Sequence, residues 1–229
     1  MKIGGLQPVT ILDYPGKMAA IVFTAGCNMR CPFCYNFQLV LPEYLARSRW
    51  YDEDKVIDFL FRRKKYLDGL VLSGGEPTLQ PDLPQFLAKM KKIGYDIKLD
   101  TNGYIPEALN RLIEEKLIDY VALDIKGQFD DYRKFTGVDS GPVKESIELV
   151  MASGLPYEFR STLVKGLHDL KSVEAMAKAI KGVEKYYLQN YSDQSPLAGE
   201  RFKGQPFTRR ELEEFCIAAK KFVKHCEIR

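Results

Sequence analysis

The stretch AAIVFTAGCNMRCPFC, residues 19–34, sets the expectations for the rest of the chain. It begins with an apolar run, Ala19 to Phe23, that predicts a buried β-strand. Three cysteines follow, Cys27, Cys31 and Cys34, in the spacing C-x3-C-x2-C. The sequence therefore predicts a cysteine cluster on a loop directly after the carboxyl end of a buried strand.

Beyond this stretch, strand patterns and helix patterns alternate. Start and stop signals separate the segments, such as Asp52 before one helix and Gly94 after another. The expected strands are residues 19–23, 70–72, 95–99, 120–123, 157–163 and 185–188, and the expected helices are residues 52–66, 82–93, 106–116, 143–153, 172–180 and 208–224. Such alternation indicates parallel strands with helices outside them.

Six strand–helix units are fewer than the eight of a closed barrel, which takes about 250 residues. The 229 residues therefore predict an α/β fold: a partial (open) TIM-type barrel of about six units, with parallel strands inside and helices outside. No linker or repeat divides the sequence. We expect a single domain over residues 1–229, in which residues 1–18 are an N-terminal extension before the first barrel strand.

Polar motifs occur where the expected strands end. They are the cysteine loop, Gly74-Gly75-Glu76-Pro77, Asp100-Thr101-Asn102-Gly103, Asp124-Ile125-Lys126 and Arg160. The carboxyl ends of parallel strands share one rim of a barrel, and active sites lie at that rim. We therefore expect these distant segments to converge on one mouth.

Composition and charge exclude several classes of protein. Hydrophobic residues make up 45% of the chain and charged residues 28%, the balance of a folded globular protein. The net charge of +3 is too small to indicate a nucleic-acid partner. Apolar runs such as residues 18–23 are shorter than the ~20 residues of a membrane span, and residues 1–8 lack the apolar core of a secretory signal. We expect a cytoplasmic protein with no membrane partner.

The five cysteines do not suggest disulfides, because an odd number in a reducing compartment favours metal binding or redox chemistry. A zinc ion would take its fourth ligand from a distant Cys216, Cys226, His168 or His225. An ordinary four-iron cluster needs four thiolates. We favour a third interpretation over zinc and over uncoordinated cysteines: a four-iron cluster held by three thiolates, with one iron open to a non-protein ligand. Cys216 falls on an apolar helix face, which predicts a core position, and Cys226 lies near an expected frayed C-terminus.

The spacing C-x3-C-x-aromatic-C after a first strand, followed by Gly-Gly-Glu-Pro after a second, resembles the radical S-adenosylmethionine (radical SAM) enzymes. The match extends across most of the chain and looks closest to the branch that activates glycyl radical enzymes. Lys2–Gln7 and Leu12–Gly16 are similar to activating proteins of the anaerobic ribonucleoside-triphosphate reductase. The resemblance implies a [4Fe-4S] cluster that reductively cleaves S-adenosylmethionine to a 5′-deoxyadenosyl radical, so no side chain is expected to be catalytic itself.

The same resemblance implies a role for individual residues. Cys27, Cys31 and Cys34 would bind three irons. The implied contacts to S-adenosylmethionine are Phe33 and Tyr35 at the cluster and adenine, Gly74 and Gly75 where the backbone approaches the ligand, Glu76 near the amino group, and Asp124 and Lys126 near the amino acid and ribose portions. Asp100 and Thr101 resemble the residues that hold a monovalent cation beside the ligand in pyruvate formate-lyase activating enzyme, and Thr101 would also face the ligand.

Two further contacts are expected on the later strands. Arg160, if it points inward, would pair with a carboxylate. A histidine that contacts the ligand in the relative is missing here, and Gln189 or Tyr191 stands in its place.

Each of these motifs also has a plainer structural interpretation. Gly74 to Pro77 reads equally as a tight turn before a helix, and Asp100 to Gly103 as an Asx-type turn. Asp124 and Lys126 would pair on a solvated loop, and Arg160 would lie on the surface.

A compact barrel with an open side suits a macromolecular substrate. The resemblance implies that the protein abstracts a glycine Cα hydrogen from a partner, most closely the anaerobic ribonucleoside-triphosphate reductase, with electrons from a flavodoxin or ferredoxin. The alternatives are an activase of a different glycyl radical enzyme, a compact radical SAM enzyme acting on a small metabolite or nucleobase precursor, an electron-transfer iron–sulfur protein, and a zinc-stabilised interaction module.

Overall fold

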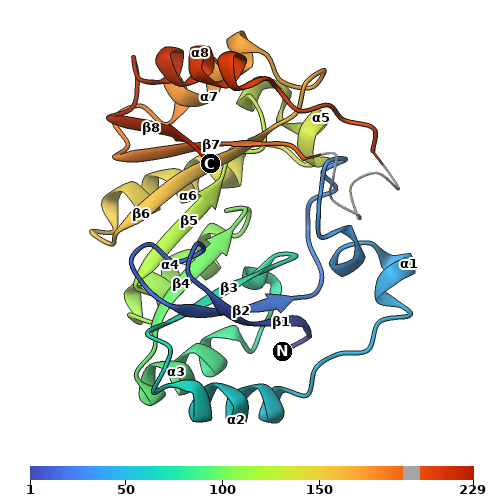
Figure 1. Ribbon diagram of the computed structural model, residues 1–229, viewed down its shortest axis with the longest axis vertical. Coiled ribbons are helices and arrows are strands. Elements are labelled where there is room, and N and C mark those ends of the chain that lie inside the picture. The colour runs from blue at the N-terminus through green and yellow to red at the C-terminus, as the bar shows by residue number, and fades with distance from the viewer. Residues whose placement is uncertain (193–201) are drawn as a thin grey trace.

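A computed structural model describes residues 1–192 and 202–229 (Figure 1). The strands of these residues form one curved sheet in sequence order, in which β1 pairs with β2 antiparallel and the others pair in parallel. They are β1 (Ile3–Thr10), β2 (Ala19–Thr24), β3 (Gly69–Gly74), β4 (Asp96–Thr101), β5 (Tyr120–Asp124), β6 (Tyr157–Leu163), β7 (Lys185–Asn190) and β8 (His225–Ile228). Within the described part of the chain β1 and β8 do not pair, so the barrel is open.

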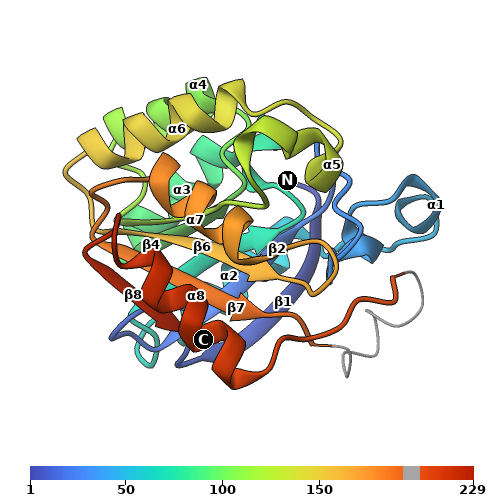
Figure 2. The same ribbon diagram turned by 90° about the horizontal axis from the view of Figure 1, so that it is seen from above.

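Helices lie outside this sheet, as Figure 2 shows from above. The helices that follow β2 to β7 are α2 (Glu53–Arg63), α3 (Leu83–Ile93), α4 (Pro106–Glu114), α6 (Gly141–Ala152), α7 (Leu170–Ala179) and α8 (Arg209–Ala219). These pairs confirm the six predicted strand–helix units and the partial barrel. The connections add the short helices α1 (Pro42–Leu45) and α5 (Tyr132–Thr136) and the 3-10 turns η1 (Phe37–Leu39), η2 (Pro77–Leu79) and η3 (Phe129–Asp131), none of which we predicted.

Local capping chemistry sets several of the helix ends. The side chain of Asp52 accepts a hydrogen bond from the backbone of Lys55 at the start of α2. Gly94 ends α3 in the left-handed conformation. Thr208 and Glu211 form a reciprocal capping box at the start of α8. All three helix ends agree with the sequence signals.

The two edges of the sheet correct the sequence prediction. Residues 1–18 are more than an extension, because Ile3–Thr10 pair along β2 with two irregularities of register. Gly4, Gly5 and Pro8 hid this strand, since glycine and proline are unfavourable inside strands. The last helix ends at Ala219 rather than near Lys224, and β8 follows it, too short for its period to be recognised.

Strand β8 also changes the interpretation of Cys226, which was expected near a frayed end. Cys226 is buried, and its Sγ lies 2.8 Å from the Sγ of Cys216 on α8. Cys216 is a core residue, as its helix face predicted.

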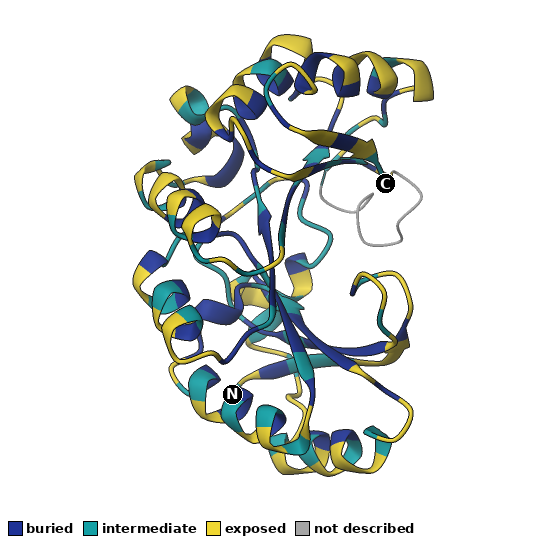
Figure 3. Cartoon of the chain, turned by 90° about the vertical axis from the view of Figure 1, so that its left-hand side faces the viewer, coloured by how far each residue is buried: buried dark blue, intermediate teal, exposed yellow. Residues whose placement is uncertain are grey.

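Side chains alternate sharply between the two faces of the central strands. Toward the helices β4, β5 and β6 carry fully buried apolar residues, among them Leu99, Val121 and Phe159. Figure 3 shows the helices turning their buried sides to the sheet and their exposed sides outward. In the part of the chain that the structure describes, no helix is long and apolar enough to cross a membrane.

The inner face of the same strands carries charge instead. Glu158 on β6 is fully buried and accepts hydrogen bonds from Lys98 Nζ at 3.3 Å, from Tyr120 Oη at 3.0 Å and from both terminal nitrogens of Arg229 at 3.0 and 3.1 Å. Burial alone would raise the pKa of Glu158, but the surrounding cations outweigh it and lower the pKa. Lys98 also donates to the backbone oxygen of Asp13 at 2.6 Å, which ties the turn after β1 to the barrel interior.

Candidate functional site

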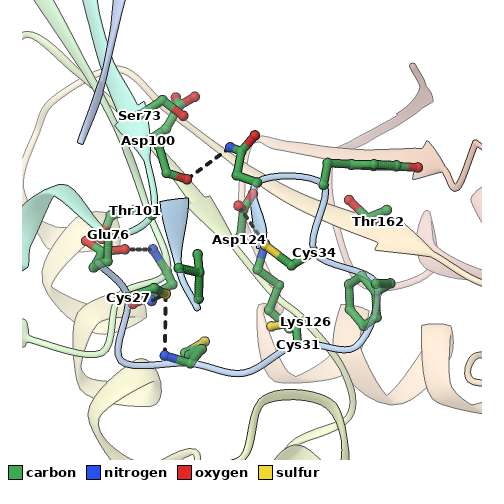
Figure 4. Close-up of a pocket in the computed structure, with 18 residues that line it drawn as sticks. Cys27, Cys31, Cys34, Ser73, Glu76, Asp100, Thr101, Asp124, Lys126 and Thr162 are labelled. Carbon is green, nitrogen blue, oxygen red and sulfur yellow. Dashed lines mark hydrogen bonds and ion pairs between the residues drawn. The ribbon is translucent and has the colours of Figure 1, made fainter. Parts of the chain in front are cut away.

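A cavity of about 850 Å³, measured out to its open mouth, lies at the carboxyl ends of β2 to β6. Its size is that of a small-molecule site. The predicted residues that line it are Cys27, Cys31, Phe33, Cys34, Tyr35, Gly74, Gly75, Glu76, Asp100, Thr101, Asp124 and Lys126. The cysteine loop and the segments at Gly74–Glu76, Asp100–Asn102 and Asp124–Lys126 therefore converge on one mouth as predicted, whereas Arg160 does not line it (Figure 4).

The three cysteines enter this cavity from the loop after β2. Figure 4 shows Cys27 near Glu76 and Thr101, and Cys31 and Cys34 near Lys126. Burial raises the pKa of Cys27 to about 11 and that of Cys31 to about 12. Such thiols are protonated at neutral pH, so a metal that binds them must displace their protons.

A zinc site fits these residues poorly. Across residues 1–192 and 202–229, no three Cys, His, Asp or Glu side chains lie close enough to share one metal ion. His168, a candidate fourth ligand, has both ring nitrogens engaged, one by the backbone N–H of Val164 at 3.0 Å and the other by the backbone oxygen of Lys126 at 3.2 Å. A four-iron cluster is larger than one ion and spaces its thiolates farther apart, so three half-buried cysteines around one cavity suit it better.

Close backbone contacts explain why glycine occupies positions 74 and 75, at the end of β3 and directly after it. A Cβ on Gly75 would lie 2.0 Å from the carbonyl oxygen of Gly26, and a Cβ on Gly74, whose φ is +122°, would lie 2.4 Å from backbone atoms of Thr24. The backbone N–H of Glu76 donates to the same Gly26 oxygen at 2.8 Å. The Gly-Gly pair therefore packs directly against the segment that leads into Cys27.

Glu76 is fully buried and fixes the end of the neighbouring strand. Its carboxylate accepts hydrogen bonds from the backbone and hydroxyl of Thr78, from the Thr101 hydroxyl at 2.7 Å and from the backbone N–H of Asn102 at 2.8 Å. Burial raises the pKa of Glu76, and these hydrogen bonds oppose the rise. The carboxylate is thus committed to protein donors, and Glu76 joins the end of β3 to the end of β4.

A charged group lies beside the cavity: Asp100, Asp124 and Lys126 line it from the ends of β4 and β5, and Arg160, in the middle of β6 rather than at its end, lies behind them and is not part of the lining. Arg160 points inward: its Nε donates to Asp124 at 2.9 Å and its Nη1 lies 3.3 Å from Asp100. Lys126 Nζ donates to the other Asp124 oxygen at 2.9 Å. Burial would raise the pKa of Asp124, but Arg160 and Lys126 outweigh it and lower the pKa to about 2. One oxygen of Asp100 is buried without a hydrogen-bond partner among the described residues.

Two aromatic residues at the end of the cysteine loop, Phe33 and Tyr35, form part of the cavity wall. Phe33 is buried and meets His168 edge-on, with ring centroids 5.8 Å apart. Tyr35 stacks on Tyr191 at 5.6 Å. Gln189 is half-buried on β7 opposite Thr162 of β6, and it is not part of the cavity lining, whereas Thr162 is.

Sequence reasoning missed several residues of this site. Asn28, Asn36 and Asn102 are amides whose side chains bond to site segments: Asn102 Nδ2 donates to Asn28 Oδ1 at 2.8 Å, and Asn36 Nδ2 donates to the Gly74 oxygen at 3.0 Å. Asn102 was visible only as part of a turn motif. No spacing signal distinguishes an asparagine that bonds across a site from one that shapes a turn.

Comparisons with known proteins agree with this geometry. The family model of the radical SAM superfamily matches residues 21–180. A protein of Methanocaldococcus jannaschii, whose name assigns it to the glycyl-radical enzyme activating enzymes, is 36% identical over 235 residues, which cover 99% of this chain and 95% of that protein. Pyruvate formate-lyase-activating enzyme of Clostridium pasteurianum is 30% identical over 202 residues, covering 83% and 82%.

Solved structures show the same fold. A radical SAM methyltransferase from Sphaerobacter thermophilus superposes with a TM-score of 0.74 at 14% identity, over 96% of this chain and 68% of that chain. A domain of pyruvate-formate lyase-activating enzyme from Bacteroides vulgatus superposes with a TM-score of 0.58 at 19% identity, over 70% and 98%.

Proposed function

The chain belongs to the radical SAM superfamily and, within it, to the glycyl-radical enzyme activating enzymes, and from this membership we propose that its partner is the anaerobic ribonucleoside-triphosphate reductase. The observation that supports an activase most directly is the gathering of three cysteines and four charged side chains, Glu76, Asp100, Asp124 and Lys126, around one cavity of an open barrel. The choice of partner is supported by the similarity of Lys2–Gln7 and Leu12–Gly16 to the reductase activators. These residues form β1 and the turn that Lys98 ties to the barrel interior.

Membership in the family implies a [4Fe-4S] cluster and S-adenosylmethionine, which together supply the one-electron chemistry that removes a glycine Cα hydrogen. Cys27, Cys31 and Cys34 would hold three irons of the cluster. Asp124 and Lys126 would present paired charges to the zwitterionic amino acid portion of the ligand, since both line the cavity with opposite signs.

The remaining residues would shape the ligand site. Phe33 and Tyr35 would form its aromatic wall, and Gly74 and Gly75 would hold the backbone against the cysteine loop. Glu76 would lie beside the amino group of the ligand. It would also hold the end of β4 in place, because its carboxylate accepts the backbone N–H of Asn102.

Arg160 would affect the ligand indirectly, because its Nε hydrogen bond holds Asp124 in place. In the position of the relative's histidine, Tyr191 is better placed than Gln189, because its ring stacks on Tyr35 of the cavity wall.

A monovalent cation would bind at Asp100. Its buried Oδ1 accepts no hydrogen bond from the described residues, which supports this proposal, and the cation would have to compete with Lys98 Nζ, which lies 3.6 Å from the same oxygen. Thr101, the second predicted ligand, donates its hydroxyl to Glu76 and accepts the backbone N–H of Gly103 at 3.1 Å, which leaves one oxygen lone pair for a cation.

The test is an anaerobic electron paramagnetic resonance assay. Reconstituted protein, dithionite, S-adenosylmethionine and the purified reductase should give a glycyl doublet, and a reductase with its radical glycine changed to alanine should give none. A Cys31→Ala protein is the control for cluster-independent signal. Cofactor cleavage with no doublet would overturn the partner, and no cleavage by a cluster-loaded protein would overturn the radical chemistry.

A second candidate partner is pyruvate formate-lyase, because a relative at 30% identity is named for activating it. The same assay with that enzyme distinguishes the two partners. We further propose a reduced flavodoxin or ferredoxin as electron donor; either should replace dithionite in the assay if it delivers electrons to this site.

A further inference from the structure

Asn102 connects the cysteine loop to the end of β4. Its Nδ2 lies 3.6 Å from the Sγ of Cys27 and also donates to Asn28 Oδ1 at 2.8 Å. An amide nitrogen carries two hydrogens, so both contacts can be made at once. Cys27 thus receives a side-chain donor from another strand end, in addition to the backbone N–H of Met29 at 3.4 Å.

The side chain of Asn102 is held in this orientation from several directions. Its backbone N–H donates to the buried carboxylate of Glu76 at 2.8 Å. Its Oδ1 accepts the backbone N–H of Tyr104 at 2.9 Å, which closes a local Asx turn. Only 6% of Asn102 is exposed, so water does not compete strongly for its amide. The amide that faces Cys27 is therefore fixed before any cluster binds.

A hydrogen bond to a cluster sulfur stabilises added negative charge and raises the reduction potential of the cluster. We propose that Asn102 is a positioning residue for Cys27 and that its amide raises the reduction potential of the iron–sulfur cluster that Cys27 holds. This inference rests on the proposed function, because it takes Cys27 as a cluster ligand.

Two substitutions separate the hydrogen bond from the turn. Asn102→Asp keeps an oxygen for the N–H of Tyr104 but offers Cys27 no amide hydrogen. Asn102→Ala removes both the turn contact and the hydrogen bond to sulfur. The matched control is Asn110→Ala, since Asn110 is a half-buried residue of α4 whose side chain, among the described residues, bonds only to Glu114 on the same helix.

The measurement is a potentiometric titration of the reconstituted cluster, followed by electron paramagnetic resonance. Both Asn102 variants should show a lower potential than the wild type, with Asn102→Asp lower than Asn102→Ala because it also adds negative charge. For Asn102→Asp we expect the reduced-to-oxidised ratio at a fixed solution potential to fall about tenfold, which is about 59 mV for a one-electron couple. Asn110→Ala should match the wild type.

Other outcomes overturn the inference. Equal potentials in the wild type and both Asn102 variants would do so while leaving the proposed function intact. A lower potential in Asn102→Ala alone would assign the effect to the turn. Loss of the cluster from both variants, with Asn110→Ala loaded normally, would make the role of Asn102 purely structural. A wild-type protein that forms no four-iron cluster would overturn the proposed function as well.

Discussion

The two faces of strands β4, β5 and β6 differ in chemistry although alternate residues of the same strands build them. The outer face is apolar, with Leu99 and Phe159 fully buried against the helices. The inner face carries a column of charge from Glu158, through Arg160, to Asp124 at the rim. Closed barrels fill their interior with branched aliphatic side chains. The comparison teaches that this open barrel buries most of its apolar core on one face, whereas on the other face paired charges are held beside the site.

The largest expected loss of stability comes from a substitution on the apolar outer face. Phe159→Ala should lower the free energy of unfolding by about 3–5 kcal/mol, because it removes a fully buried aromatic side chain and leaves a cavity. Anaerobic urea denaturation measures this loss. Phe61→Ala on the exposed side of α2 is the control and should change the free energy by less than about 0.5 kcal/mol. Similar losses in the two variants would mean that the outer face is not the stabilising one.

The next largest loss of stability is expected from a substitution among the inner charges. Arg160→Met should lower the free energy of unfolding by about 3 kcal/mol, because it leaves Asp100 and Asp124 buried without the guanidinium between them. The pKa of Asp124 should rise at the same time, which carboxyl NMR or infrared titration detects. An Arg160→Met protein as stable as the wild type would show that the inner charges contribute nothing to the fold.

The pH dependence of stability sharpens the comparison. The pKa of Asp124 is lowered to about 2 from an unfolded value near 3.8, so its contribution is fully present above the unfolded pKa. We expect about 2 kcal/mol to be lost as pH falls from about 4 toward 2. The measurement is the difference in unfolding free energy between wild type and Asp124→Asn across that range. A difference that does not vary with pH would contradict the assigned shift.

The smallest effect lies on neither face. Arg62 and Asp58 form an ion pair on the exposed side of α2, with 71% and 57% of their side chains accessible to solvent. Arg62→Ala should therefore change the free energy of unfolding by less than about 0.5 kcal/mol, and added salt should reduce even that change. A loss of unfolding free energy above about 1 kcal/mol would contradict this expectation, because it would mean that an exposed ion pair stabilises the fold as the buried inner charges do.

The outer face explains why much of the fold could be predicted from the sequence. Its apolar residues give the strands and the amphipathic helices their periods, so the six units and their order follow from pattern alone. The edges could not be predicted in the same way. β1 contains Gly4, Gly5 and Pro8, and β8 has four residues, so neither carries a readable period.

The sequence predicted which segments form the candidate site, but not the contacts that their side chains make with one another. The cysteine spacing and the strand-end motifs located the cavity because parallel strands share a rim. The commitment of Glu76 to Thr78, Thr101 and Asn102 could not be predicted, since it depends on how two strand ends meet in space. The same holds for Asn102, whose partner Cys27 is far away in the sequence.

The contact between Gly75 and the carbonyl of Gly26 has a consequence for protein engineering. The backbone at Gly75 lies so close to Gly26, which leads into the three-cysteine loop, that there is no room for a methyl group between them. Anyone who transplants the loop into another scaffold must carry the glycine pair of the next strand with it. The smallest portable unit is two adjacent strand ends.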